Sequence, residues 1–271
     1  YLHPSGLFAA TGNWVQGSPT LADLDGDGRL EVIVPSRDHW LYVWRSDGTG
    51  YLNPDGKFGD FLAPCISCYS RFKAAQYDIE RNPELRKQVD EIIGYTYQDR
   101  VAIKSTLDIL EERVGLEAIA KRVKKPLRDL KVVAYYGCLQ TRPPKVTGAD
   151  HPENPMGMDR IVEKLGAAAL DWSFKTDCCG GSLSLTRTDI VLNLTRKILD
   201  NARAVGADAL VTGCPLCHVN LDTRQDALKL DQPMPILFIT QLMGLAFGLE
   251  PHALGLEKHL VDTRGIVARA Q

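Results

Sequence analysis

The sequence predicts an α/β protein in which a mainly parallel sheet is flanked by helices. Apolar runs such as "LKVVAYYGC" at residues 130–138 and "DALVTGC" at residues 208–214 are typical of buried strands. Between them, "RTDIVLNLTRKILDNARAVGA" at residues 187–207 has helical periodicity. Strands that alternate with helices in this way indicate a parallel sheet. Both apolar runs end at a cysteine, and α/β folds bind their ligands beyond the carboxyl ends of the strands.

Other segments from Phe61 onward fit the same pattern. Helices are predicted within residues 70–98 and 103–125, and residues 215–230 form a predicted helix whose Pro215 suits the first turn. The tract "PILFITQLMGLAFGL" at residues 235–249 is interrupted by polar residues and is shorter than the roughly 18 apolar residues of a membrane span. We therefore expect a buried strand followed by a buried helix there, and no membrane span.

Composition narrows the class of protein. The 271-residue chain is 44% hydrophobic, with a formal net charge of -2. A chain with this charge lacks the basic surface that a nucleic-acid-binding protein requires, so we do not expect it to bind nucleic acid. The seven cysteines are an odd number and include two C-x-x-C pairs, which favours metal or redox chemistry in the reducing cytosol over secreted disulfides. We expect a cytoplasmic protein, although a chain that begins at Tyr1 leaves processing of its N-terminus open.

The N-terminal part predicts a β-hairpin and a loop suited to calcium. The runs "LEVIVP" and "WLYVW" are separated by turn-forming residues. Positions 1, 3, 5 and 9 of a glycine-containing loop are acidic and could converge on one calcium ion. These residues are Asp23, Asp25, Asp27 and Glu31. Val34 stands where an EF-hand would have its last acidic ligand, so that motif is excluded. A turn without a metal remains the alternative.

Residues 17–50 with this D-x-D-G-D-G loop resemble one FG-GAP or VCBS β-propeller repeat. The resemblance implies one blade of a repeat protein. Such a unit needs about three copies to bury its apolar faces, and the sequence shows one.

The later cysteines form a second pattern. Cys138 is followed by the pair Cys178 and Cys179, and then by Cys214 and Cys217. Five thiolates exceed the four ligands of a tetrahedral zinc ion, whereas an iron–sulfur cluster can use them. Gly180 and Gly181 would let the backbone come close to such a cofactor.

The phrases "YYGCLQTRPP", "HPENPMGMDRIV", "CCGGSLSLTR" and "CPLCHVNLDTRQ" resemble the CCG, or cysteine-rich, domain of the heterodisulfide reductase B subunit. The resemblance runs from about Phe61 to the end of the chain. It implies a noncubane four-iron cluster held by Cys138, Cys178, Cys179, Cys214 and Cys217. It also implies that a small anionic disulfide, coenzyme M–coenzyme B or a related one, is reduced by one-electron steps, with electrons supplied by iron–sulfur partner subunits. Arg142 and Lys145, just after Cys138, are candidates for steering the anion, with a solvated loop as the alternative.

The chain departs from the family in one respect. Of the first of two CCG modules it contains only the C-x-x-C pair Cys65 and Cys68, which would leave a second metal site incomplete. We therefore expect a fusion, a truncated gene or an assembly artefact, with a β segment at residues 1–60, a helical remnant of the first module at 61–130 and a complete second module at 131–271. Both C-x-x-C pairs follow a short apolar stretch.

Other functions fit parts of the pattern. Zinc could bind the two C-x-x-C pairs, and "CPLCH" at residues 214–218 matches a c-type haem attachment motif, although we expect His218 to be a helix residue near the cluster or an exposed one. A thioredoxin-like dithiol is a further possibility for either pair, although the flanking segments do not match that fold. A non-catalytic fragment that binds zinc or calcium as a structural module is the alternative to an oxidoreductase subunit.

Overall fold

The computed structural model describes residues 20–22, 31–35, 41–44, 61–94, 96–97 and 101–270, with only the backbone in the first three ranges. The chain divides into two compact units. The first contains residues 1–61 and 97–103, and the second contains residues 62–96 and 104–271. Each unit is described by itself.

The first unit contains a three-stranded antiparallel sheet in the order β1-β2-β3. Its strands are β1 (Thr20–Ala22), β2 (Glu31–Pro35) and β3 (Leu41–Trp44). The pairing of β2 with β3 confirms the predicted hairpin. Asp23, Asp25 and Asp27 lie outside the described residues, and Glu31 is described only as the first residue of β2, so the calcium site stays a prediction.

The second unit is built on a four-stranded parallel sheet in the order β7-β6-β8-β9. The strands are β6 (Lys131–Tyr135), β7 (Ala168–Ala169), β8 (Ala209–Thr212) and β9 (Ile236–Phe238). The chain goes from β6 outward to β7 and then returns past β6 to β8. The strand order therefore reverses between β6 and β8, which is the position where open α/β sheets bind ligands. This sheet confirms the predicted fold class.

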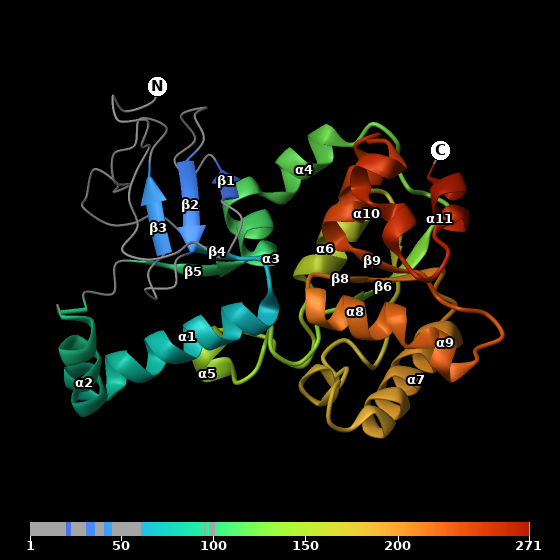
Figure 1. The fold of residues 1–271 in the computed structure, drawn as a ribbon. Helices are drawn as coiled ribbons and strands as arrows, with labels where there is room; N and C mark the ends of the chain where they lie inside the picture. The colour runs from blue at the N-terminus through green and yellow to red at the C-terminus, as the bar shows by residue number, and fades with distance from the viewer. Residues whose placement is uncertain are drawn as a thin grey trace, which may run out of the picture. The chain divides into compact units, whose positions relative to one another are not determined.

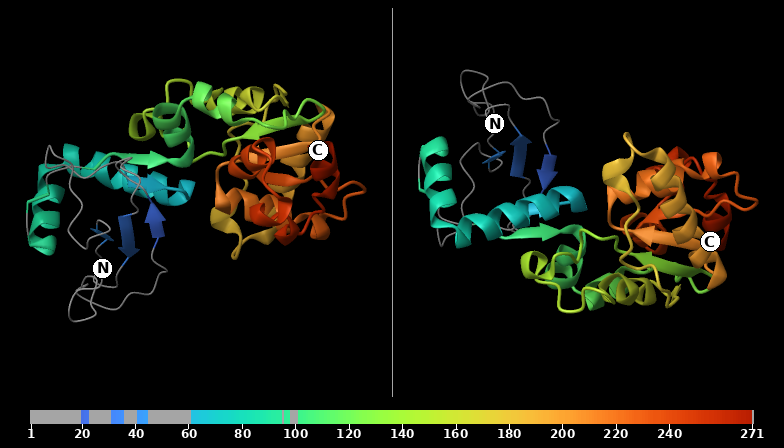
Figure 2. Two further views of the ribbon diagram at one scale, coloured as in Figure 1. Left: turned by 90° about the horizontal axis from the view of Figure 1, so that it is seen from above. Right: turned by 90° about the horizontal axis from the view of Figure 1, so that it is seen from below.

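Helices cover both faces of this sheet, as Figures 1 and 2 show. The longer described helices, of which α2 and most of α1 lie away from this sheet, are α1 (Ile66–Arg81), α2 (Pro83–Ile93), α4 (Leu116–Arg122), α6 (Gly157–Lys164), α7 (Thr188–Ala204), α8 (Pro215–Thr223) and α10 (Ile239–Ala246). The shorter ones are α3 (Thr106–Asp108), η1 (Ile109–Val114), α5 (Pro144–Thr147), η2 (Gly181–Leu183), α9 (Gln225–Leu228), η3 (Pro251–Leu254), η4 (Leu256–Lys258) and α11 (Arg264–Arg269). In the described part of the chain, none is long and apolar enough to cross a bilayer.

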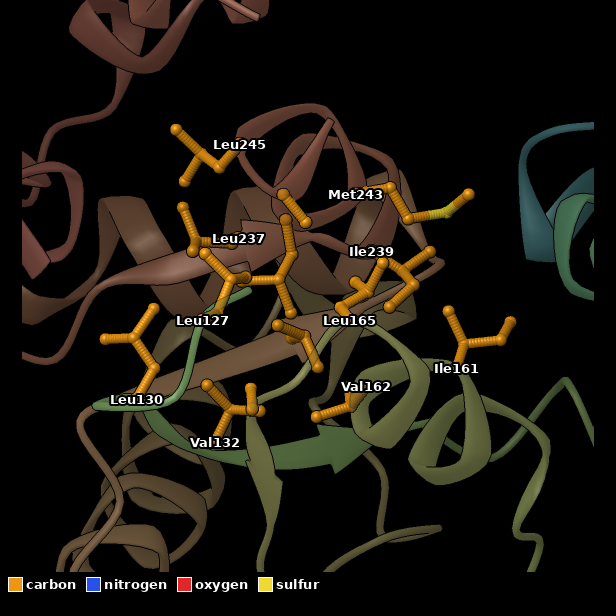
Figure 3. Packing of buried hydrophobic residues seen from close by; sticks show 14 of the residues in the cluster. Leu127, Leu130, Val132, Ile161, Val162, Leu165, Leu237, Ile239, Met243 and Leu245 are labelled. Carbon is orange, nitrogen blue, oxygen red and sulfur yellow. The ribbon is translucent and has the colours of Figure 1, made fainter. Parts of the chain in front are cut away.

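One face of the sheet packs against α6 and α10. Alternate strand residues point to opposite faces, and Val132, Val211 and Leu237 all belong to this core. Figure 3 shows Val132 and Leu237 with Ile161 of α6 and Leu245 of α10 in the same cluster. Burial of such side chains supplies the main stabilisation of the layer, since each contributes about 1.5–3 kcal/mol.

The opposite face packs against α7 and α8. Val133, Tyr135 and Leu210 point to this face and contact a core that includes Leu199 of α7 and Leu221 of α8. Three cysteines belong to the same buried cluster: Cys179, Cys214 and Cys217. Sulfur atoms are thus part of the packing on this side of the sheet.

Two predicted helical segments are interrupted. Residues 70–98 do not form one helix, because Asn82 is extended and caps a new helix that begins at Pro83. Proline at a first helical position has no N–H to satisfy and suits a new start. Residues 103–125 begin with the short strand β5 (Ile103–Ser105), which pairs with β4 (Phe61–Ala63). Gly115, with a φ of 80°, then separates η1 from α4.

Candidate functional site

The cysteines of the CCG pattern gather where the strand order reverses. Cys138 follows β6 and Cys214 follows β8, and these two strands are adjacent and parallel. Cys178 and Cys179 come from the loop after β7, on the other side of β6. All three groups therefore approach from the carboxyl ends of neighbouring strands; the sequence predicted this for Cys138 and Cys214, but not for the loop of Cys178 and Cys179.

The five sulfurs form a pair and a row of three. In the row, Cys179 Sγ lies 3.4 Å from Cys217 Sγ, and Cys217 is in turn hydrogen-bonded to Cys214. Cys138 is hydrogen-bonded to Cys178. Within the described residues, no three His, Cys, Asp or Glu side chains converge as ligands of one metal ion would. The sulfurs thus form two groups, the pair Cys138–Cys178 and the row Cys179–Cys217–Cys214.

The backbone that carries the two adjacent cysteines is anchored to the end of β6. The Tyr135 hydroxyl donates a 2.6 Å hydrogen bond to the carbonyl of Asp177, and the Tyr136 N–H donates to the carbonyl of Lys175 at 2.9 Å. The indole N–H of Trp172 donates to the Ala134 carbonyl at 3.0 Å. Tyr135 was not predicted from the sequence, although it directly precedes the "YGC" turn and is fully buried.

Glycines allow close approach at three places in the site. Gly180 has a φ of 78°, which L-residues rarely adopt, and its N–H donates to Cys178 Sγ at 3.3 Å. A Cβ on Gly181 would lie 2.7 Å from Leu216 Cδ2. Gly137, which was not predicted either, has a φ of 68°, and a Cβ there would lie 3.1 Å from Cys217 Sγ. The binding role predicted for Gly180 and Gly181 stays a prediction.

Hydrogen bonds among the thiols separate their pKa values. The hydrogen bond from Cys138 lowers the pKa of Cys178 to about 6, and the Gly180 N–H acts in the same direction. The hydrogen bond from Cys217 lowers the pKa of Cys214 to about 7, helped by backbone N–H groups of Cys217, Leu216 and Ile66. The pKa of Cys179 is also lowered, chiefly by Cys217. The pKa values of the donors, Cys138 and Cys217, are raised, so the thiolate form is favoured at Cys178, Cys179 and Cys214 over their two donors.

This arrangement predicts a pH dependence of thiol reactivity. In iron-free protein, iodoacetamide should modify Cys178 with a midpoint near pH 6, because the lowered pKa keeps its thiolate present at acidic pH. Cys68 is the control: it is also exposed, but partial burial and the hydrogen bond to Cys65 raise its pKa above the usual 9.0. Peptide mapping after short pulses at different pH values measures both rates. Equal midpoints for the two cysteines would contradict the arrangement.

The other C-x-x-C pair lies at the start of α1. Cys65 is the N-cap residue of this helix, and Cys68 is hydrogen-bonded to it. The pair lies outside the two sulfur groups above, but the adjacent backbone touches them, since the Ile66 N–H hydrogen-bonds the sulfur of Cys214. Whether Cys65 and Cys68 bind a metal stays a prediction.

The basic residues after Cys138 have partners in the described structure. The Arg142 guanidinium forms an ion pair with Glu153 and donates to the Thr176 hydroxyl at 3.1 Å. Lys145 Nζ lies 5.7 Å from the centre of the Tyr77 ring. Arg142 therefore ties its loop to the segment before Cys178, and a role of either residue in steering an anion stays a prediction.

His218 of the "CPLCH" motif is a core residue. Its ring stacks on Phe238 with centroids 4.2 Å apart, and its Nε2 lies 3.0 Å from the Ile236 carbonyl oxygen. Only 8% of the residue is exposed, so the alternative of an exposed histidine is wrong. Packing against the sheet accounts for this histidine without a haem.

Comparison with known proteins gives a consistent picture. Residues 132–222 match the family model of the CCG cysteine-rich domain. The chain is 31% identical over 219 residues to the ferredoxin:CoB-CoM heterodisulfide reductase B subunit of Methanosarcina mazei, a match that covers 78% of this chain and 73% of that protein. It is 32% identical over 208 residues to the 8-methylmenaquinol:fumarate reductase membrane anchor subunit of Wolinella succinogenes, covering 74% and 72%.

A solved structure shares the fold. The crystal structure of a hypothetical protein from Helicobacter pylori aligns with a TM-score of 0.57 at 16% identity. The alignment covers 72% of this chain and 36% of that one, so the present chain spans about a third of the solved protein. The resemblance of residues 17–50 to a propeller repeat gains no support from these comparisons.

Proposed function

Because the chain belongs to the B subunit family of heterodisulfide reductases, we propose that it is an iron–sulfur oxidoreductase subunit that reduces a disulfide. The observation that carries the proposal is the placement of a cysteine pair and a row of three cysteines near the reversal of strand order between β6 and β8. Folds of this class bind small molecules or cofactors at this position, and the cysteine thiols found there favour metal–sulfur chemistry.

The residues fit an iron–sulfur cluster in three ways. The donor set contains five thiols, of which three have lowered pKa values and can bind metal as thiolates. The pair Cys138–Cys178 and the row Cys179–Cys217–Cys214 form two groups, which an iron–sulfur cluster with several irons can use as ligands. Gly137 and Gly181 keep Cβ atoms away from Cys217 and Leu216, so the backbone can lie close to the sulfurs.

The proposed ligands of a noncubane four-iron cluster are Cys138, Cys178, Cys179, Cys214 and Cys217. Such a cluster transfers electrons one at a time, whereas cleavage of a disulfide to two thiols takes two electrons and two protons. Tyr135 holds the loop of Cys178 through the Asp177 carbonyl, and the Asn220 amide donates to the carbonyl of Cys179 at 3.2 Å. These two contacts hold in place the turn that carries the adjacent sulfurs of Cys178 and Cys179.

The substrate we propose is a small anionic disulfide, either the CoB-CoM heterodisulfide that the relatives' names contain or a related one. The electrons would come from iron–sulfur partner subunits. A reducing compartment such as the cytoplasm is proposed because seven cysteines with two C-x-x-C pairs suit metal or redox chemistry better than structural disulfides. The alternative of a non-catalytic zinc or calcium module predicts a different metal content, which the following test separates.

Protein purified without oxygen should contain about four irons and a matching amount of sulfide per chain. After the chain is reduced with a viologen, addition of the heterodisulfide should release two free thiols for every two electrons consumed. Elemental analysis and thiol titration measure the two quantities. Zinc at one ion per chain in place of iron, or no bound metal at all, would contradict the proposal.

A further inference from the structure

The first C-x-x-C pair repeats the local geometry of the second. Cys65 follows β4 and caps α1 with φ −91° and ψ 119°, while Cys214 follows β8 and caps α8 with φ −106° and ψ 113°. In both pairs the second cysteine lies three residues on and is hydrogen-bonded to the first. The two segments therefore share their backbone conformation at the N-cap, although only the Cys214 sulfur accepts a hydrogen bond from the N–H of its second cysteine.

The surroundings of the two pairs differ. Cys214 and Cys217 are buried, and Cys217 continues to Cys179 at 3.4 Å. Cys68 is exposed and Cys65 is partly exposed. A pair of accessible thiols that touch each other has the composition of a redox dithiol.

The geometry also permits a bond between the two sulfurs. The Tyr69 N–H donates to the Cys65 carbonyl at 2.8 Å, so the turn from Cys65 to Tyr69 is helical. Side chains three residues apart on a helical turn are neighbours about 5–6 Å apart at Cβ, and a disulfide requires about 3.5–4.5 Å. Rotation about χ1 moves the sulfurs but leaves the Cβ atoms in place, so the bond also requires the extended backbone of the N-cap residue Cys65 to move by about 1–2 Å.

We propose that Cys65 and Cys68 form a second redox site, a dithiol that exchanges with small organic disulfides. One thiolate of the pair attacks a sulfur of the small disulfide, and the other half leaves as a thiolate. The remaining cysteine then attacks the mixed disulfide, which releases the second half and closes the Cys65–Cys68 bond. Two cysteine thiols are oxidised and one small disulfide is reduced to two thiols, so atoms and electrons balance.

The site lies next to the five sulfurs. The N–H of Ile66, which lies between the two cysteines of the pair in the sequence, hydrogen-bonds Cys214. Closing of the Cys65–Cys68 bond changes the first turn of α1, from which this N–H projects. Oxidation of the dithiol by a small disulfide is therefore expected to alter the hydrogen bond to Cys214, whether or not the main site carries iron.

Trypsin offers a direct test in the full chain. Cleavage after Lys57 and Arg71 places Cys65 and Cys68 alone on one peptide, and cleavage after Arg203 and Arg224 does the same for Cys214 and Cys217. The protein is treated with glutathione disulfide, quenched with iodoacetamide and digested. We expect the first peptide to lose two hydrogen atoms and to resist alkylation, and dithiothreitol to reverse this. The buried second pair is the matched control, and its peptide should stay unchanged.

Single substitutions separate the steps. In the Cys68→Ser variant, Cys65 should accumulate as a mixed disulfide with glutathione, because the closing step is lost. In the Cys65→Ser/Cys68→Ser variant, iron content should equal that of the unsubstituted protein, which separates this site from the proposed cluster ligands. An unmodified first peptide, or protection of it by a bound metal that a chelator removes, would overturn the proposal.

Discussion

Substitution of Cys179 by serine should remove most of the iron from protein purified without oxygen. Cys179 is only 4% exposed and lies at the centre of the site, 3.4 Å from Cys217 and adjacent in the chain to Cys178. A hydroxyl is a poor ligand for iron compared with a thiolate, and it also loses the sulfur contact to Cys217. Iron per chain and the visible absorbance of the purified variant measure the effect.

Two controls make this result specific. Cys68→Ser changes the same atom at an exposed position outside the five-sulfur group, so its iron content should be that of the unsubstituted chain. Far-ultraviolet circular dichroism shows whether Cys179→Ser is still folded. A folded Cys179→Ser variant that keeps its full iron content would remove Cys179 from the proposed ligands, and the same comparison applies to the other four.

Substitution of Lys175 by methionine should lower the free energy of unfolding by about 3–5 kcal/mol, the usual cost of breaking a buried ion pair from one side. The side chains of Lys175 and Asp159 are each 3% exposed, and Lys175 Nζ lies 3.0 Å from Asp159 Oδ1. Tyr136 donates to the other carboxylate oxygen at 2.7 Å. Loss of the ammonium group leaves a buried negative charge without its partner. Urea titration of iron-free protein measures the change.

The matched control is an ion pair at the surface. Lys164 and Glu117 also join a lysine to a carboxylate, at 2.6 Å, but their side chains are 39% and 77% exposed. Lys164→Met should therefore lower the free energy of unfolding far less than Lys175→Met does, because solvent screens an exposed ion pair. Equal losses for the two lysines would show that the Lys175–Asp159 pair contributes no more than a surface contact.

The buried pair also bears on the site. The carbonyl of Lys175, three residues before Cys178, accepts hydrogen bonds from the N–H groups of Tyr136 and Gly137. Asp159 belongs to α6, so the ion pair ties the segment that leads into the cysteine loop to this helix. Destabilisation by Lys175→Met is thus expected to reduce iron binding as a secondary effect.

The sequence was sufficient to predict strands β6, β8 and β9 and the positions of Cys138 and Cys214 at strand ends, whereas the two-residue strand β7 before Cys178 and Cys179 was not predicted. Apolar runs that end at Cys138 and Cys214 predict parallel strands, and the fold then requires their carboxyl ends to meet. It could not show which sulfurs touch, because the Cys179–Cys217 contact depends on how the loop after β7 returns to β6. Tyr135 and the Lys175–Asp159 pair were missed for a related reason: burial, which gives these residues their importance, is set by tertiary packing.

The helix boundaries were missed for local reasons. Asn82 and Pro83 together end one helix and start another, although the periodicity on both sides continues. Gly115 has the same effect in residues 103–125. Amphipathic pattern alone does not locate such breaks, whereas the capping residues at each of them do.

The presence of Cys179, Cys214 and Cys217 in the hydrophobic core that joins α7 and α8 to the sheet has a consequence for assembly of the protein. If these side chains are metal ligands, binding of the cofactor adds to the stability of this packing, and loss of the cofactor lowers it. Folding and metal loading are then a single linked equilibrium. Oxygen, which attacks the metal, would then lower the stability of the core that joins α7 and α8 to the sheet.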